Sequence, residues 1–282
     1  NKIRRAPVIP AHLAEYGGVK DMSALDIAAT GMLAQQLNVE VTSNNLANMN
    51  TTGFKRQRAE FQDLLYQDLL RVGSTSSDSE TIVPTGIQLG VGVKLSSLYR
   101  ITEQGNLAQT GNAYDLAVQG KGFFKISLPS GEFAYTRASS FQLGPTGQFV
   151  TADGYSVAPG IVIPPNAIGV TVNSSGQVLA KIAGQPNPQN VGQFLLAVFP
   201  NEAGLEAIGD NLFLETPASG TTVEGNPATT GFGSLLQGYV ETSNVNAVEE
   251  ITNLITAQRA YEMLARVIET SDEMFQTVAQ LS

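Results

Sequence analysis

The chain has 282 residues, of which 25 are acidic and 16 are basic, so its net charge is −9. This balance argues against a nucleic-acid partner, because phosphate binding needs a basic face. The absence of cysteine excludes disulfides and thiolate chemistry, and no stretch approaches the ~20 apolar residues that cross a membrane. The length is enough for about two domains.

Residues 1–21 are predicted to be an extended leader of uncertain role. Pro7 and Pro10 disfavour a helix there. They also interrupt the apolar core that a secretory signal would need. Met22 followed by Ser23 is typical of a natural start, so we interpret the leader as an upstream extension.

Residues 22–52 are predicted to form an amphipathic helix with Ser23 as its N-cap. A heptad row, which keeps one stripe facing a partner helix, comprises Leu25, Met32, Val39 and Leu46. Asparagines, which leave a helix readily through the left-handed conformation, crowd its exit at Asn44, Asn45, Asn48 and Asn50. Gly53 then turns the chain and Phe54 offers an apolar anchor.

Residues 244–282 are predicted to form a second, longer helix. Its heptad row comprises Leu254, Tyr261, Ile268 and Phe275. The row is widened by Ala257, Leu264 and Val278 on one flank and by Ile251, Ala265 and Ala279 on the other. A wide stripe suits a helix with more than one neighbour, although two helices packed on their own domain core would show the same pattern.

Residues 53–95 are predicted to connect the first helix to the β region. The spacing of Phe61, Leu65, Leu69 and Val72 predicts a short helix over 55–72, and 73–81 reads as a polar flexible stretch. Strict alternation from Ile87 to Leu95 predicts a half-buried strand. We expect residues 55–84, which carry their own apolar row and are too long for a simple connection, to act as a stiffener that braces against a neighbouring subunit.

Residues 96–229 are predicted to form a β-rich outer domain, because short apolar runs alternate with Gly, Pro, Asn and Ser turns. The predicted hairpins are FFKISL–EFAYTR, SSFQL–QFVT–YSV and GVTV–QVLAKI, followed by a loop over 184–190 and the strand QFLLAVF. Residues 215–234 read as a linker, with 230–243 returning to the last helix. The fold class is therefore α+β: paired, coiled-coil-like terminal helices with an inserted, mostly antiparallel β domain.

The residues supply little catalytic chemistry. The one histidine, His12, lies in the leader, where it cannot serve as the base of a nucleophilic triad. Zinc and Ca²⁺ motifs are missing. The pairs Glu249/Glu250 and Asp272/Glu273 are expected on the solvated face of the last helix, since a carboxylate dyad usually needs a buried cleft. We therefore expect no catalytic residue, no cofactor and no metal.

Four separate motifs give the chain a resemblance to the bacterial flagellar basal-body rod and hook protein family. They are SNNLANMNTTGFKRQRAEFQDLLYQ (43–67), QGNLAQTGNAYDLAVQGKGFFKI (104–126), YTRASSFQLGPTGQFVTADGYSV (135–157) and QGYVETSNVNAVEEITNLITAQRAYEMLARVIETSDEMF (237–275). The likeness covers 22–282 and is closest to the distal rod members, because hook members carry an additional outer domain. The leader departs from the family pattern.

The resemblance implies a structural subunit of the distal rod that polymerises into a rigid, hollow drive shaft. The terminal helices would form the inner domain around the export channel, with the β domain outside. The implied partners are further copies of the chain in a helical tube, the proximal rod and hook proteins, a surrounding ring bushing and the flagellar type III export apparatus. Neither nucleic acid nor membrane insertion is implied. The rod lies in the basal body, crosses the periplasm, and is exported without a cleaved signal.

The expected assembly interface combines the helix rows with the first helix's exit and the connecting segment. It comprises Leu25, Met32, Val39, Leu46, Asn44, Asn45, Asn48, Gly53, Phe54, Phe61, Leu65, Ile251, Leu254, Tyr261, Leu264, Ile268 and Phe275. Within the family, a hook or proximal-rod subunit is the alternative. Outside it, a surface binding module would need a secretory signal and one continuous stalk, and a cell-wall hydrolase would need an acid pair such as Glu249 and Glu250 in a cleft.

Overall fold

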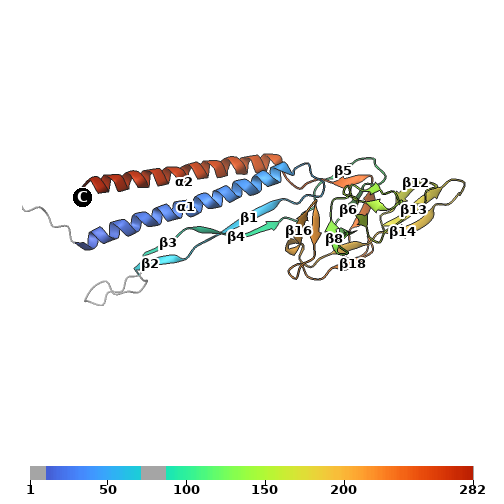
Figure 1. Ribbon diagram of the computed structural model, residues 1–282, viewed down its shortest axis with the longest axis horizontal. Helices are drawn as coiled ribbons and strands as arrows, with labels where there is room; N and C mark the ends of the chain where they lie inside the picture. Colours follow the sequence, from blue (N-terminus) through green and yellow to red (C-terminus); the bar gives the residue numbers. More distant parts are fainter. Residues whose placement is uncertain (1–10, 71–86, 282) are drawn as a thin grey trace, which may run out of the picture. The chain divides into compact units, whose positions relative to one another are not determined.

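The computed structural model describes residues 11–70 and 87–281. It divides into two compact units (Figure 1). The helical unit comprises the chain up to Asn44, Arg58–Leu98, and Val248 onward, and the β unit comprises Asn45–Gln57 and Tyr99–Ala247. The predicted α+β class, with terminal helices around a central antiparallel β region, is confirmed.

Two long helices dominate the helical unit, where they run side by side (Figure 1). Helix α1 spans Ala11–Ala47 and α2 spans Ala247–Leu281. With a rise of 1.5 Å per residue, helices of 37 and 35 residues extend over about 50–55 Å. Both predicted helices are confirmed, but Ser23 is not an N-cap, because α1 already includes residues 11–21.

The extended-leader prediction is therefore wrong for residues 11–21. Pro10 immediately precedes the helix, where a proline is tolerated because it interrupts no intrahelical hydrogen bond. Beyond Pro10 the leader contains no further proline, so nothing there stops the helix from beginning at Ala11. Residues 1–10 lie outside the described part of the chain.

A β ribbon, rather than a helix, follows α1 in the helical unit. Its strands are β1 (Gln57–Asp63) paired with β4 (Val93–Arg100), and β2 (Tyr66–Leu70) paired antiparallel with β3 (Ile87–Gly90). The short helix predicted over 55–72 is therefore wrong. The expected strand over 87–95 is present but broken, because Val91 and Gly92 separate β3 from β4. The polar stretch 73–81 lies outside the described residues.

The main sheet of the β unit is antiparallel throughout and follows the order β16-β17-β8-β7-β11-β10-β9, with β15 joining β7 to β18. Its strands are β7 (Phe123–Ser127), β8 (Phe133–Thr136), β9 (Gln142–Leu143), β10 (Phe149–Val150), β11 (Ser156–Val157), β15 (Leu196–Val198), β16 (Glu206–Gly209), β17 (Leu212–Leu214) and β18 (Val223–Gly225). A single 3-10 turn, η1 (Glu202–Gly204), precedes β16.

Three smaller sheets complete the β unit. They are β12 (Ala167–Val172), β13 (Gln177–Ile182) and β14 (Gln189–Gln193) in sequence order; β19 (Ser234–Gln237) with β6 (Leu116–Gln119); and β20 (Tyr239–Glu241) with β5 (Leu107–Gln109). The three predicted hairpins are confirmed. Residues 215–234 and 230–243 are not simple linkers, however, because they contain β18, β19 and β20, and the predicted loop over 184–190 ends within β14.

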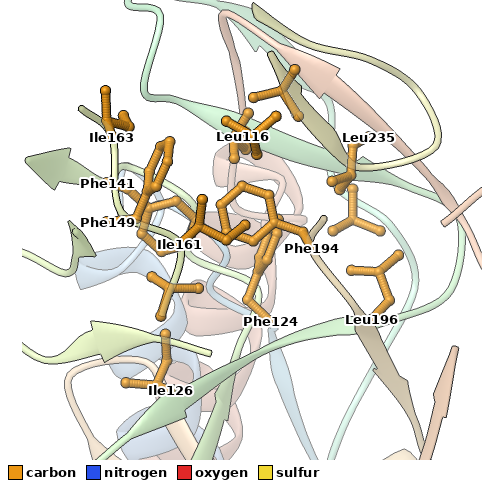
Figure 2. Close-up of a cluster of buried hydrophobic side chains, with 14 of the residues drawn as sticks. Leu116, Phe124, Ile126, Phe141, Phe149, Ile161, Ile163, Phe194, Leu196 and Leu235 are labelled. Carbon is orange, nitrogen blue, oxygen red and sulfur yellow. The ribbon is translucent and has the colours of Figure 1, made fainter. Parts of the chain in front are cut away.

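Interlocking aromatic side chains form the core of the β unit (Figure 2). The rings of Phe124 and Phe141 meet edge to face with centroids 5.1 Å apart, as do those of Phe149 and Phe194. Leu116, Leu196 and Leu235 close the cluster: Leu196 comes from β15 of the main sheet, whereas Leu116 and Leu235 bring β6 and β19 onto that sheet. Edge-to-face contacts add to the stabilisation that apolar burial provides.

Candidate assembly surface

Small residues hold the two helices of the helical unit close together. Gly31 on α1 faces Leu264 on α2 so closely that a Cβ at Gly31 would lie 3.1 Å from the Leu264 Cδ1 atom. On α2, Glu250, Ala257 and Ser271 are buried, and with Leu264 they repeat every seven residues. The row that packs against α1 is therefore a heptad seam. It contains the predicted flank residues Ala257 and Leu264 and is not centred on the predicted row of Leu254, Tyr261, Ile268 and Phe275.

The rows predicted for assembly are only partly covered within the chain. On α1, Leu25, Met32, Val39 and Leu46 are all half-buried, whereas the most buried side chains are Ala28, Ala34, Val41, Thr42 and Asn45. On α2, Leu254, Leu264, Ile268 and Phe275 are half-buried, whereas Ile251 and Tyr261 are exposed. The contact inside the chain thus uses one side of each predicted stripe and leaves the other side open.

Exposed apolar side chains line α2 away from its seam. We call them the outer apolar face of α2, and they are Val248, Ile251, Ile255, Tyr261, Met263, Val267 and Met274. Leu33 on α1 is also 67% exposed. Exposed apolar residues in such number on one helix favour an interaction surface.

The ribbon presents further apolar residues. Leu65 is 85% exposed, and Tyr66, Leu95 and Leu98 are exposed as well, whereas Phe61 is half-buried. Thr30 of α1 pins the ribbon, because its Oγ1 accepts a hydrogen bond from the Val93 amide at 3.3 Å. The ribbon is thus fixed on α1 while part of its apolar surface stays open.

The asparagine-rich exit of α1 is held by contacts within the β unit. The Asn45 side chain donates to the Gln57 carbonyl at 2.9 Å and accepts from the Gln57 amide at 2.8 Å. The Gly53 amide donates to the Glu241 carbonyl, and Gly53 has φ +69 with a would-be Cβ 2.6 Å from the Ala138 nitrogen. Asn45 and Gly53 therefore shape the chain itself.

The other predicted residues of this exit are placed at or near the surface. Asn44 is exposed, whereas Asn48 and Phe54 are half-buried. The Asn48 side chain accepts a hydrogen bond from the Thr51 hydroxyl at 3.2 Å.

A buried ionic cluster, which the sequence analysis missed, ties together three distant parts of the β unit. Glu241 binds Lys55 Nζ at 2.5 Å and Arg137 Nε at 2.9 Å, and all three side chains are at most 5% exposed. Burial lowers the pKa of Lys55, while the adjacent Glu241 opposes that shift. The one sign of this cluster in the sequence was Glu241 itself, a carboxylate that directly follows the apolar residues of β20.

The described residues form no cluster of metal-ligating side chains. Among residues 11–70 and 87–281, no group of three or more His, Asp or Glu side chains is placed to hold a metal ion. Glu249 is exposed but Glu250 is buried, so the predicted solvated position is wrong for Glu250. Within the same residues, neither long helix is apolar enough to cross a membrane.

Comparisons with known proteins match nearly the whole chain. Three family models match: "Flagella basal body rod protein" over residues 25–55, "Flagellar hook protein FlgE/F/G D1 domain" over 117–180, and "Flagellar basal body rod FlgEFG protein C-terminal" over 236–281. The "Flagellar basal-body rod protein FlgG" of Caulobacter vibrioides is 64% identical over 92% of this chain and 99% of its own length.

More distant relatives separate two kinds of rod protein. The FlgG protein of Bacillus subtilis is 36% identical over 89% of this chain and 96% of its own length. The "Flagellar basal-body rod protein FlgF" of Caulobacter vibrioides is 31% identical over 92% of this chain and 97% of its own length. Identity to a FlgG protein from one bacterium is thus about twice the identity to the FlgF protein from that same bacterium.

Proposed function

Because the chain belongs to the flagellar basal-body rod protein family, we propose that it is a structural subunit of the distal rod. Its 64% identity to a FlgG protein, against 31% to FlgF from the same bacterium, favours the distal rod over other axial positions. The role is mechanical: many copies form a rigid, hollow shaft that carries torque from the motor to the hook. The family is a structural one, and we assign the chain no catalytic role.

The observation that carries this proposal is the outer apolar face of α2. Burying an apolar side chain such as Ile251 or Met263 contributes about 1.5–3 kcal/mol. Several such residues along one helix therefore favour lateral packing between copies. The exposed Leu65 and Tyr66 of the ribbon offer a second contact in another direction, and a shaft under torque needs coupling in more than one direction.

The roles of the expected assembly residues are part of this proposal. Leu254, Leu264, Ile268 and Phe275 stabilise the pairing of α1 with α2, and Ile251 and Tyr261 meet neighbouring copies. We further propose that the subunit contacts the proximal rod, the hook proteins and a surrounding ring. We also propose that it passes through the type III export apparatus without a cleaved signal and that the assembled rod crosses the periplasm. Shared family and the open helix face support these assignments.

A charge placed on the outer face tests the proposal. The double variant Ile251→Glu, Ile255→Glu should abolish tube formation and motility, because carboxylates would have to be desolvated at each contact. Ile168→Glu is the matched control, since Ile168 is 69% exposed on β12, outside the proposed surface. The tubes are scored by sedimentation and electron microscopy. Straight tubes from the double variant would refute the proposed surface.

Amide hydrogen exchange on the dilute monomer tests how the helices form. We expect α1 and α2 to exchange far faster than β7 and β8, because half of each apolar stripe stays uncovered until copies meet. Protection in the tube should then rise mainly in the helices. Equal protection of helices and strands in the monomer would mean that the pair is stable alone, and assembly would then join preformed units.

A further inference from the structure

A cavity in the β unit lies against the buried ionic cluster. Its volume is about 520 Å³, and Lys55 and Arg137 belong to its lining. Lys121, Glu103 and Glu202 also line it. Phe123, Phe199 and Pro200 supply apolar wall. The cavity therefore combines a charged base with partly apolar sides.

The cluster beneath this cavity carries an excess positive charge. Lys55 and Arg137 contribute two positive charges and Glu241 one negative charge, so the sum is +1. All three side chains are almost completely buried. Glu202 at the cavity offsets part of this charge, because it favours the charged form of Lys55. An anion placed beside the cluster would offset the rest.

Lys55 also retains donor capacity on the cavity side. An ammonium group has three N–H donors. In the described part of the chain, Lys55 Nζ has two acceptors, the Glu103 carbonyl at 2.8 Å and Glu241 Oε1 at 2.5 Å. Because Lys55 lines the cavity, the third donor can serve a ligand held there.

We propose that this cavity binds a carboxylate group, with Lys55 as the buried donor and Lys121 as a second, exposed cation. Charge-assisted hydrogen bonds from ammonium groups to carboxylates are among the strong ones. Glu103 and Glu202 at the cavity oppose a second negative charge, so the site suits one carboxylate rather than a polyanion. The carboxylate can come from a free organic acid or from an acidic side chain of another copy.

The experiment titrates the full chain with sodium acetate while sodium chloride keeps the ionic strength constant. Backbone amide shifts in NMR spectra are followed at Gly120, Lys121 and Ala203. We expect shifts that saturate with acetate. Lys121→Gln should weaken binding by up to about fivefold, and Glu202→Gln should strengthen it by a similar factor, as expected for single exposed charges.

Lys181→Gln is the matched control, because Lys181 is an exposed lysine on β13 that does not line the cavity. It should leave acetate binding unchanged. Shifts that never saturate, or equal affinities in Lys121→Gln, Glu202→Gln and the wild type, would overturn the proposal. None of these variants removes a residue of the buried cluster, so loss of folding does not obscure the result.

A second measurement separates the two sources of the carboxylate. If a neighbouring copy supplies it, acetate should weaken self-association in analytical ultracentrifugation, and Lys121→Gln should do so by the same factor as its loss of acetate affinity. If a free acid is the ligand, acetate should bind while self-association stays unchanged. Either result supports the site, whereas the absence of acetate binding in the monomer overturns it.

Discussion

Replacing Glu241 by glutamine should destabilise the β unit by about 3–5 kcal/mol, the cost of removing one partner from a buried ion pair. Glu241 is 1% exposed and accepts hydrogen bonds from Lys55, from Arg137 and from the Gly105 amide at 3.0 Å. Glutamine keeps the shape but leaves two buried cations without a counter-charge. Because domains are stable by only ~5–15 kcal/mol, the loss is a large fraction of the total.

Urea unfolding followed by near-UV circular dichroism measures this loss, because the buried aromatic side chains belong to the β unit. Glu224→Gln is the control: it makes the same charge change in the Lys125–Glu224 pair, which is 2.6 Å long but 21% and 34% exposed. That pair should contribute at most ~1 kcal/mol. If the two variants lose equal stability at an unchanged m-value, the reasoning about the buried cluster is refuted.

Two further predictions concern Lys55 and the ribbon. Burial lowers the pKa of Lys55 below its usual 10.5, so the unfolded chain binds that proton more tightly. The free energy of unfolding of the wild type minus that of Lys55→Met should therefore increase as the pH rises from the lowered pKa of Lys55 toward 10.5. A difference that does not change with pH would contradict this. Gly92→Ala should loosen the ribbon by about 1–3 kcal/mol, because Gly92 has φ +127 and its Cβ would lie 2.3 Å from Thr30 Oγ1. Faster hydrogen exchange at the Val93 amide measures that loosening, and Gly169→Ala, where a Cβ meets nothing within 4 Å, should cause none.

Local signals predicted the helices and hairpins well. The heptad rows of α1 and α2 need only the sequence within each helix, and the turn at Asp153–Gly154 is encoded by a glycine that adopts φ +87. The leader was misread because Pro7 and Pro10 constrain only their own surroundings. A helix that begins at Ala11 satisfies both prolines.

The error over 55–72 has a geometric cause. Phe61, Leu65 and Leu69 are spaced by four, which fits one face of a helix, but Phe61 lies in β1, Leu65 between the strands and Leu69 in β2. Half-buried and exposed residues alternate along Gln57–Phe61, which is the pattern of a strand. The choice is made by pairing with β3 and β4, whose residues lie far along the chain and leave no trace in the local pattern.

The ionic cluster was equally invisible, because its members are separated by up to 186 residues in sequence. Lys55 comes from the entry to the β unit, Arg137 follows β8, and Glu241 ends β20 near the exit. Until β20 is in place, Lys55 and Arg137 would be buried without the carboxylate of Glu241. The closure of the β unit therefore depends on its last strand. On the export route proposed above, the chain would gain its stable β unit only once Glu241 has arrived, which couples completion of the subunit to its folding.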